Sequence, residues 1–269
     1  MQGTALELGC DHTAYGSYAS GQPSPETAWV ISVGADIDSP GLRFKGDKSQ
    51  PNEDGLLLAT EGERVLLAVA DAHFGIAASH ELLLALLRVL SGAATSIPAS
   101  AAELADLMRE TMRKASESDA DADPGSATTL LIAIYDRKTR EGCGLSFGDS
   151  TFTLLGASGH RQPLGSTAAD FVSLADPAGM DPDNADAFSF VAEPGDLLLA
   201  YTDGINECHY GQPQTSVTPK CMEQLLHQTG SDPHAYLRSL VELALAGVDE
   251  NPGGQDNIAV VAARARATS

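Results

Sequence analysis

Three aspartates stand at the tips of strongly apolar segments. Asp71 closes "RVLLAVAD" (64–71), Asp203 closes "DLLLAYTD" (196–203), and Asp256 opens "DNIAVVAARA" (256–265). A carboxylate at the tip of a buried strand costs free energy unless it is paired or coordinated. If a sheet brings these tips together, a bound cation is needed to neutralise them, and an all-oxygen ligand set favours Mg²⁺ or Mn²⁺.

Two further features extend this candidate site. Glu53 and Asp54 in "NED" (52–54) precede another apolar segment and offer a fourth acidic corner. His73 follows Asp71 by two residues. An imidazole has a pKa close to neutral pH, so His73 in such a site could act as a general acid.

Each of these residues also has an ordinary structural interpretation. Asp71 could cap a helix that begins near residue 74, and Asp203-Gly204 and Asp256-Asn257 are common turn pairs. His73 could be a turn residue that hydrogen-bonds the backbone. The metal-site hypothesis depends on the three strand tips and "NED" occurring together.

The strands and helices that would position these residues occur in alternating groups along the chain. Apolar runs predict strands over 27–35, 55–60, 64–71, 127–136, 142–149, 150–156, 196–203 and 256–265. Helical spacing predicts helix pairs over 74–94 with 101–117, and near 218–229 with 232–247. This order predicts an α+β fold in which helix pairs cover the sheets.

The remaining segments set the expected domain organisation. Residues 1–25 are rich in Gly, Ser, Tyr and Pro without a period, and we expect a flexible N-terminal leader there. Residues 26–269 are expected to form a single domain. Residues 157–190 carry few periodic apolar residues, which predicts a long surface excursion, usually a functional or mobile feature.

Composition limits the possible partners and location. The 269 residues include 37 acidic and 16 basic side chains, a formal net charge of −21, which disfavours binding to nucleic acid and to anionic membranes. No apolar run is long enough to span a bilayer, and the first basic residue is Arg43, so no signal-peptide pattern is present. The four cysteines lack metal or disulfide spacing, and we expect a cytoplasmic protein.

Six short motifs occur in a characteristic order: "NEDG" (52–55), "VADAHFG" (69–75), "SATTLLIAI" (126–134), "SFGDST" (146–151), "LLLAYTDGINE" (197–207) and "GGQDNIAVVAA" (253–263). The set resembles the metal-dependent protein phosphatases of the protein phosphatase 2C (PPM) type. The resemblance implies a two-layered antiparallel β-sandwich flanked by helix pairs. "YTDGINE" is closer to the sporulation-type branch, whereas "NED" and "DN" are closer to the eukaryote-like branch, and both subfamilies stay open at this point.

The resemblance also implies roles for individual residues. The metal site would be formed by Asp71, the Ala72 carbonyl oxygen, Asp203, Asp256 and Asp54. Asp71 would bridge two metals, the Ala72 carbonyl oxygen would bind one of them, and Asp203 and Asp256 would bind the other. Asp54 would act together with Glu53 in holding metal-bound waters. Asp149 matches the acid that binds a third metal in some members, and His73 matches the proposed general acid.

Three positions depart from the family pattern. Ser49 stands where the family usually has the Arg or Lys that clamps the substrate phosphate, which leaves Arg43 or Lys48 as candidates for that role. Phe74 replaces a glycine beside the metals, and Thr151 replaces an arginine.

The sequence therefore predicts a Mg²⁺- or Mn²⁺-dependent hydrolase with two or three ions, acting on phosphoserine and phosphothreonine in a phosphorylated protein. The metal ions would activate a water molecule and neutralise charge on the phosphoryl oxygens. The alternative is a pseudophosphatase that keeps the fold and binds phosphoproteins without turnover, and the three departures motivate it.

Overall fold

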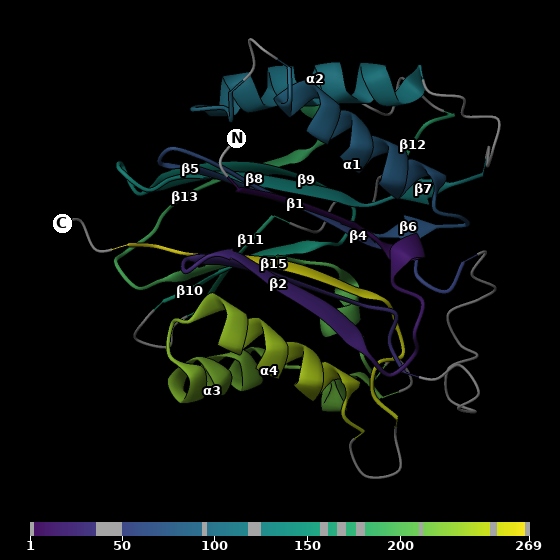
Figure 1. The fold of residues 1–269 in the computed structure, drawn as a ribbon, viewed down its shortest axis with the longest axis vertical. Coiled ribbons are helices and arrows are strands. Elements are labelled where there is room, and N and C mark those ends of the chain that lie inside the picture. The colour runs from purple at the N-terminus through teal and green to yellow at the C-terminus, as the bar shows by residue number, and fades with distance from the viewer. Residues whose placement is uncertain are drawn as a thin grey trace.

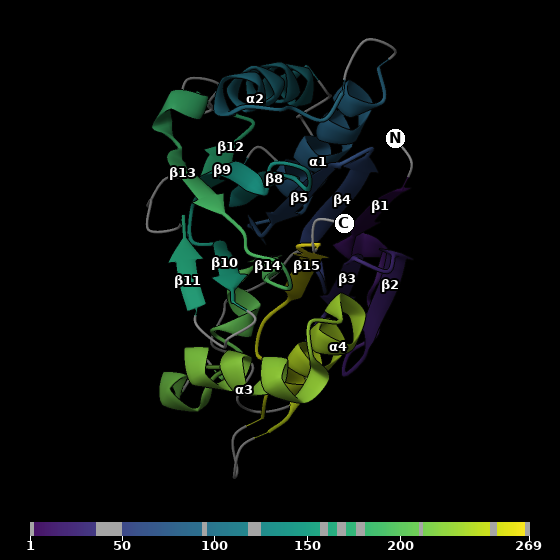
Figure 2. The ribbon, with the colours of Figure 1, turned by 90° about the vertical axis from the view of Figure 1, so that its left-hand side faces the viewer.

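The computed structural model is a sandwich of two antiparallel six-stranded sheets between two helix pairs (Figures 1 and 2). It describes residues 3–35, 50–92, 96–117, 125–156, 161–165, 171–175, 181–209, 212–247 and 252–266. The first sheet has the order β1 (Gly3–Leu8), β4 (Gly55–Glu61), β5 (Arg64–Ala70), β8 (Leu130–Asp136), β9 (Glu141–Phe147), β13 (Asp186–Val191). The second has the order β11 (Arg161–Leu164), β10 (Thr151–Leu155), β14 (Leu197–Tyr201), β15 (Ile258–Arg264), β3 (Thr27–Ser32), β2 (Tyr18–Ser24). The predicted fold class is confirmed.

The helices cover the outer faces of the sheets. Helices α1 (Ala77–Leu90) and α2 (Ala101–Ser116) pack on the first sheet, and α3 (Pro219–Thr229) and α4 (Pro233–Leu245) pack on the second (Figure 1). Side-chain caps fix the starts of three helices, at Ser100, Thr218 and Asp232. Within the described residues, no helix is long and apolar enough to cross a membrane.

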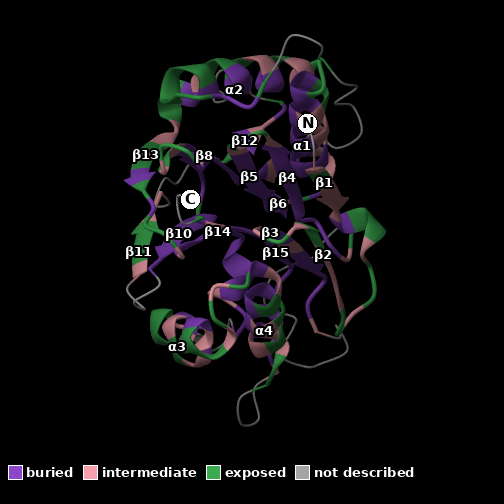
Figure 3. Cartoon of the chain, turned by 60° about the vertical axis from the view of Figure 1, so that its left-hand side comes forward, coloured by how far each residue is buried: buried purple, intermediate pink, exposed green. Residues whose placement is uncertain are grey.

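Burial on both faces explains why the central strands are apolar without alternation. In β4, Leu56 and Leu58 point into the core between the sheets, while Leu57 and Ala59 pack towards the helices. Figure 3 shows buried residues along central strands such as β4 and β5. A strand covered on both sides reads as a continuous apolar run, which is the pattern the sequence carries.

The N-terminal segment differs from the expectation. In its described part, residues 3–24 form β1 and β2, so the prediction of a flexible leader over 1–25 is wrong there. β1 pairs with β4 and β2 pairs with β3, each at the edge of its sheet. An edge strand is only half buried and tolerates Gly and Pro, such as Pro23 in β2, which is why the apolar signal is weak.

The described part of 157–190 also contains strands that the sequence analysis did not predict. β11 and β13 lie at sheet edges, and β12 (Val172–Ser173) joins β7 (Ala127–Thr128) and β6 (Ala72–His73) in a small third sheet. These strands are short or mostly exposed, so they lack the apolar runs by which the central strands were recognised. The segment adds structure to both main sheets and to the small sheet.

Candidate active site

The predicted acidic residues lie at one end of the sandwich. Ala70, the last residue of β5, pairs with Gly55, the first residue of β4, so Asp71 and Asp54 leave the first sheet side by side. In the second sheet, the end of β14 at Tyr201 pairs with the start of β10 at Thr151. Antiparallel pairing therefore collects residues that are far apart in the sequence at a shared edge.

Three carboxylates converge at this end. One ligand oxygen from each of Asp71, Asp149 and Asp203 lies within 4.8 Å of the other two. Asp71 is 3% exposed and Asp203 is 8% exposed, whereas Asp149 is exposed. The buried carboxylates of Asp71 and Asp203 are close enough to repel each other strongly unless a cation lies between them. Their hard oxygen donors fit Mg²⁺ or Mn²⁺.

The backbone of Asp71 is held by Thr129, the residue between β7 and β8, and not by a helix. Its backbone N–H donates to Thr129 Oγ1 at 3.1 Å, and the Thr129 N–H donates to the Asp71 carbonyl at 2.8 Å. Thr129 Oγ1 also lies 2.7 Å from Ser150 Oγ, next to Asp149. Helix α1 begins at Ala77 with Ile76 as its N-cap residue, so the alternative of Asp71 as a helix cap is wrong.

Asp203 and Asp54 are joined through Thr202. The Thr202 hydroxyl donates to Asp54 Oδ2 at 2.8 Å and accepts from the Ala259 N–H at 2.9 Å. Asp203 itself opens a short 3-10 turn, Asp203–Ile205. A side chain at Gly204 would overlap the Asn257 carbonyl oxygen, so this turn needs glycine to pack against the start of β15. The turn interpretation of Asp203-Gly204 is confirmed, and it is compatible with a role of the Asp203 side chain in the site.

Asn257 connects the outer acids. Its Oδ1 accepts from the Glu53 N–H at 3.0 Å, and its Nδ2 donates to the carbonyls of Val33 and Pro51, each at 2.9 Å. The neighbouring Asp256 is buried, and its Oδ1 accepts from the Asn257 N–H at 2.8 Å. Glu53, Asp54 and Asp256 are not members of the 4.8 Å group.

Helix α1 and the turn at Gly9 hold the "NED" segment through hydrogen bonds to its backbone carbonyls. Ser79 Oγ donates to the Glu53 carbonyl at 2.8 Å, and the Gly9 N–H donates to the Asp54 carbonyl at 2.8 Å. Burial lowers the pKa of His80, which hydrogen-bonds the same Asp54 carbonyl. His80 is therefore a packed residue of this support.

His73 lies in β6, where it pairs with Ala127 of β7. Its ring meets the Phe171 ring edge to face, with centroids 4.8 Å apart and an interplanar angle of 78°. This contact restricts the orientation of the imidazole, two residues along the chain from Asp71. Ala72, whose carbonyl was predicted as a metal ligand, is buried between Asp71 and His73.

Two basic residues are candidates for clamping the substrate phosphate. The predicted candidates Arg43 and Lys48 lie outside the described residues. Thr151, which stands where the family has an arginine, is buried in β10, and its Oγ1 donates to the Asp149 carbonyl at 3.4 Å. In this structure Thr151 supports the loop that carries Asp149.

Several supporting residues were not singled out from the sequence. Thr129, Thr202 and Asn257 lie inside the quoted motifs, but their types alone do not show which backbone groups they bind. The signal that could have identified them is position: each lies beside an acid or at the tip of an apolar strand. Side-chain hydrogen bonds at such tips pair with backbone N–H and C=O groups that have no partner in a neighbouring strand.

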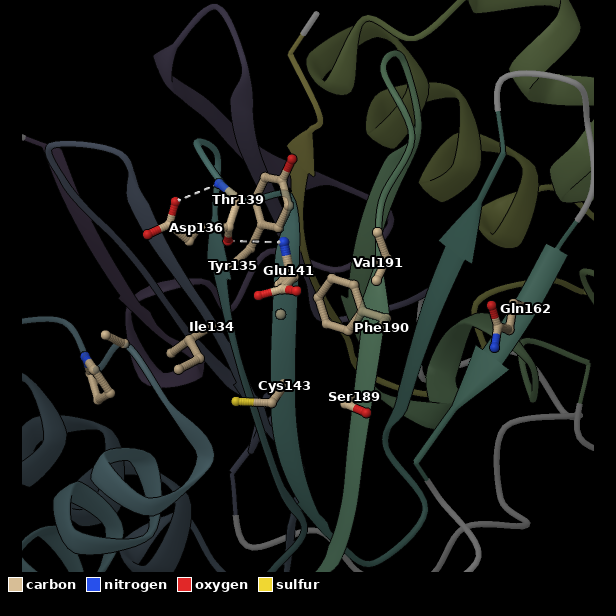
Figure 4. A pocket seen from close by; sticks show the side chains of 13 residues that line it. Ile134, Tyr135, Asp136, Thr139, Glu141, Cys143, Gln162, Ser189, Phe190 and Val191 are labelled. Atoms are coloured by element: carbon tan, nitrogen blue, oxygen red, sulfur yellow. Dashed lines mark hydrogen bonds between the residues drawn. The ribbon is translucent and has the colours of Figure 1, made fainter. Parts of the chain in front are cut away.

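A groove of about 800 Å³ lies at the other end of the strands (Figure 4). Its lining includes Tyr135 and Asp136 of β8, Cys143 of β9 and Val191 of β13. Arg64, the first residue of β5, pairs with Asp136, whereas Asp71 follows the last residue of that strand. The groove is therefore separated from the carboxylates by the length of β5.

The comparisons with known proteins agree with this geometry. The family model described as stage II sporulation protein E (SpoIIE) matches residues 61–266, well over half of the chain. The chain belongs to the SpoIIE family. This result decides between the two branches suggested by the motifs and confirms the resemblance to PPM phosphatases. A search of curated protein sequences found no match.

Solved phosphatase structures share the fold of this SpoIIE-family chain. The catalytic domain of the serine/threonine phosphatase PstP, in complex with two manganese ions, superposes with a TM-score of 0.61 at 19% identity, covering 98% of this chain and 100% of that one. The PPM phosphatase MsPP from Mycobacterium smegmatis gives 0.60 at 19% identity, covering 92% and 97%. A bacterial serine phosphatase gives 0.66 at 15% identity, covering 91% and 100%. At these identities the likeness establishes the fold.

Proposed function

We propose that this protein hydrolyses phosphoserine and phosphothreonine in proteins with the help of Mg²⁺ or Mn²⁺. The observation that carries the proposal is the convergence of Asp71, Asp149 and Asp203 within 4.8 Å at the edge where His73 also lies. The family membership and the manganese-bound PstP relative support the same chemistry.

Most of the proposed site residues would bind the metal ions or the water molecules around them. Asp71, Asp149 and Asp203 would hold the ions, with Asp54, Asp256, Glu53 and the Ala72 carbonyl completing the surroundings. When bound, the ions would supply an activated water and neutralise charge on the phosphoryl oxygens.

His73 would donate its proton to the departing seryl or threonyl oxygen, and the edge contact with Phe171 keeps its ring in place for this step. Thr129 and Thr202 would keep Asp71 and Asp203 at the ends of their strands, because each bonds the backbone or a neighbouring carboxylate. Their contribution is to position the ligands.

The proposed substrate is a phosphorylated protein, and the proposed compartment is the cytoplasm. The four cysteines are free, which agrees with a reducing environment. The net charge of −21 gives long-range repulsion of acidic partners, so basic segments near the phosphorylated residue would speed encounter at low salt.

A pseudophosphatase remains the second candidate, and Phe74 favours it. Phe74 stands where the family has glycine, and it adopts a left-handed backbone with φ of 62°. A large side chain therefore replaces glycine directly after the proposed proton donor. Under this alternative the protein binds phosphoproteins and metal without turnover.

The test is an assay of phosphate release from a phosphoserine peptide by the manganese-loaded protein. Wild type is compared with Asp203→Asn and with Glu193→Gln, a matched control in an exposed pair with Arg140 at the other end of the sandwich. The proposal predicts turnover on the order of 1 s⁻¹ for wild type and the control, and a loss of about a hundredfold or more for Asp203→Asn. Equal rates in all three reject it, and binding without turnover supports the pseudophosphatase.

A further inference from the structure

Two exposed phenylalanines flank His73. Among the described residues, the exposed large hydrophobic side chains are Phe74 at 76%, Phe171 at 40% and Val191 at 58%. The Phe171 and Phe74 rings lie 4.8 Å and 6.5 Å, centroid to centroid, from the His73 ring. Two of the three exposed apolar side chains therefore gather at the proposed proton donor.

The small third sheet creates this arrangement. β7 pairs with β6 on one side and β12 on the other, which places Phe171, the residue before β12, beside His73 of β6. Phe74 directly follows β6. Segments that are about a hundred residues apart in the sequence thus meet around one imidazole.

Folding does not account for Phe74. A positive φ is unfavourable for a bulky residue, and glycine would adopt it without cost. The exposed ring also contributes little to core burial, because three quarters of it faces solvent. A strained, exposed aromatic residue beside a site is better explained by contact with a ligand.

We propose that Phe74 and Phe171 form an apolar subsite for the side chain next to the phosphorylated residue of a protein substrate. The inference rests on the proposed function. For His73 to reach the leaving oxygen, the substrate backbone must pass beside it, and consecutive residues are only about 3.8 Å apart. The side chain of the adjacent substrate residue would then contact the rings of Phe74 and Phe171. The occupant is an aliphatic or aromatic residue such as leucine.

The charge of the protein supports this choice of occupant. A net charge of −21 repels a phosphopeptide of net negative charge at long range, so the overall charge of the protein does not help such a peptide to bind. Apolar contact with the rings supplies an attraction that salt does not screen.

The test uses two phosphoserine peptides that differ only in the flanking residues, leucine in one and alanine in the other. Both are measured as substrates of the manganese-loaded protein, and their phosphonate analogues are measured for affinity by calorimetry. We expect wild type to favour the leucine peptide by about tenfold in kcat/KM and in Kd. Phe74→Gly and Phe171→Ala should each reduce this ratio to about threefold or less.

The ratio within each variant removes any general effect on activity or folding. Val191→Ala is the matched control, since Val191 is exposed but lies at the other end of β13, in the groove of Figure 4. It should keep the tenfold ratio. Phe74→Gly additionally relieves the left-handed backbone, so loss of preference in a well-folded variant is expected.

Each remaining outcome separates the inference from the proposed function. Hydrolysis of both peptides at equal kcat/KM, with equal affinities, overturns the subsite and leaves the function standing. Preferential binding of the leucine analogue without turnover overturns the function and keeps the subsite. No binding of either analogue overturns both. If wild type is a dimer that Phe74→Gly makes monomeric with no peptide preference, the phenylalanines cover a second copy and the subsite is rejected.

Discussion

Asp203→Asn should stabilise the metal-free protein and weaken its stabilisation by metal. Two unit charges 4.8 Å apart, the limit for the carboxylate group, repel by about 3.5 kcal/mol at an effective dielectric constant near 20. Neutralising Asp203 removes this repulsion with the buried Asp71 and a smaller, solvent-screened part with the exposed Asp149. After allowing for native contacts that the amide makes less well, we expect a gain of about 2 kcal/mol.

The assay is thermal unfolding in EDTA and in excess MnCl₂. In EDTA the variant should melt about 4–8 °C above wild type, from roughly 2–4 °C per kcal/mol for a chain of this size. With manganese at about a hundred times Kd, wild type should gain about 2.7 kcal/mol and overtake the variant. The control Glu193→Gln should follow wild type in both buffers.

The crossing of the two stabilities is the diagnostic result. A variant that melts below wild type in EDTA, and that gains as much as wild type from manganese, would refute the reasoning. It would show that the carboxylates are not held together against their own repulsion, and that Asp203 does not bind the ion.

Three further predictions concern Asn257, Gly204 and Tyr135. Asn257→Ala removes the bridge to Glu53, Val33 and Pro51, and manganese affinity by calorimetry should fall about 10–100-fold; unchanged affinity would contradict the bridging role. Gly204→Ala introduces an overlap with the Asn257 carbonyl, and denaturant unfolding should show a loss of about 1–3 kcal/mol, whereas a neutral change would mean that the turn can move freely. Burial raises the pKa of Tyr135 to about 12, so the unfolded chain deprotonates first and stability should fall as pH rises from about 10 to 12. Tyr135→Phe should flatten that fall, and an identical alkaline profile would refute the assignment.

The central strands and the helices could be predicted from the sequence because their signals are strong. Strands such as β4 and β5 are buried on both faces and read as continuous apolar runs. The four helices carry apolar residues at helical spacing, and three of them begin at a side-chain cap. The predicted strand tips at Asp71 and Asp203 do converge, since antiparallel pairing places them at one edge.

The edge strands could not be predicted, because edge positions select weakly for apolar residues. β2 and β11 each contain proline, and β13 is mostly exposed, so none carries the pattern of the core. The resemblance assigned Asp149 to a third metal, and in the structure one of its oxygens lies within 4.8 Å of oxygens of Asp71 and Asp203. The distances between the acidic side chains could not be predicted from the sequence, because they depend on how the two sheets pack.

The central claim is that divalent ions hold these carboxylates together, and anomalous diffraction from crystals soaked in MnCl₂ tests it most directly. We predict manganese peaks within about 2.0–2.3 Å of oxygens from Asp71, Asp149 and Asp203. A fully soaked crystal with no anomalous peak among these three side chains would contradict the claim.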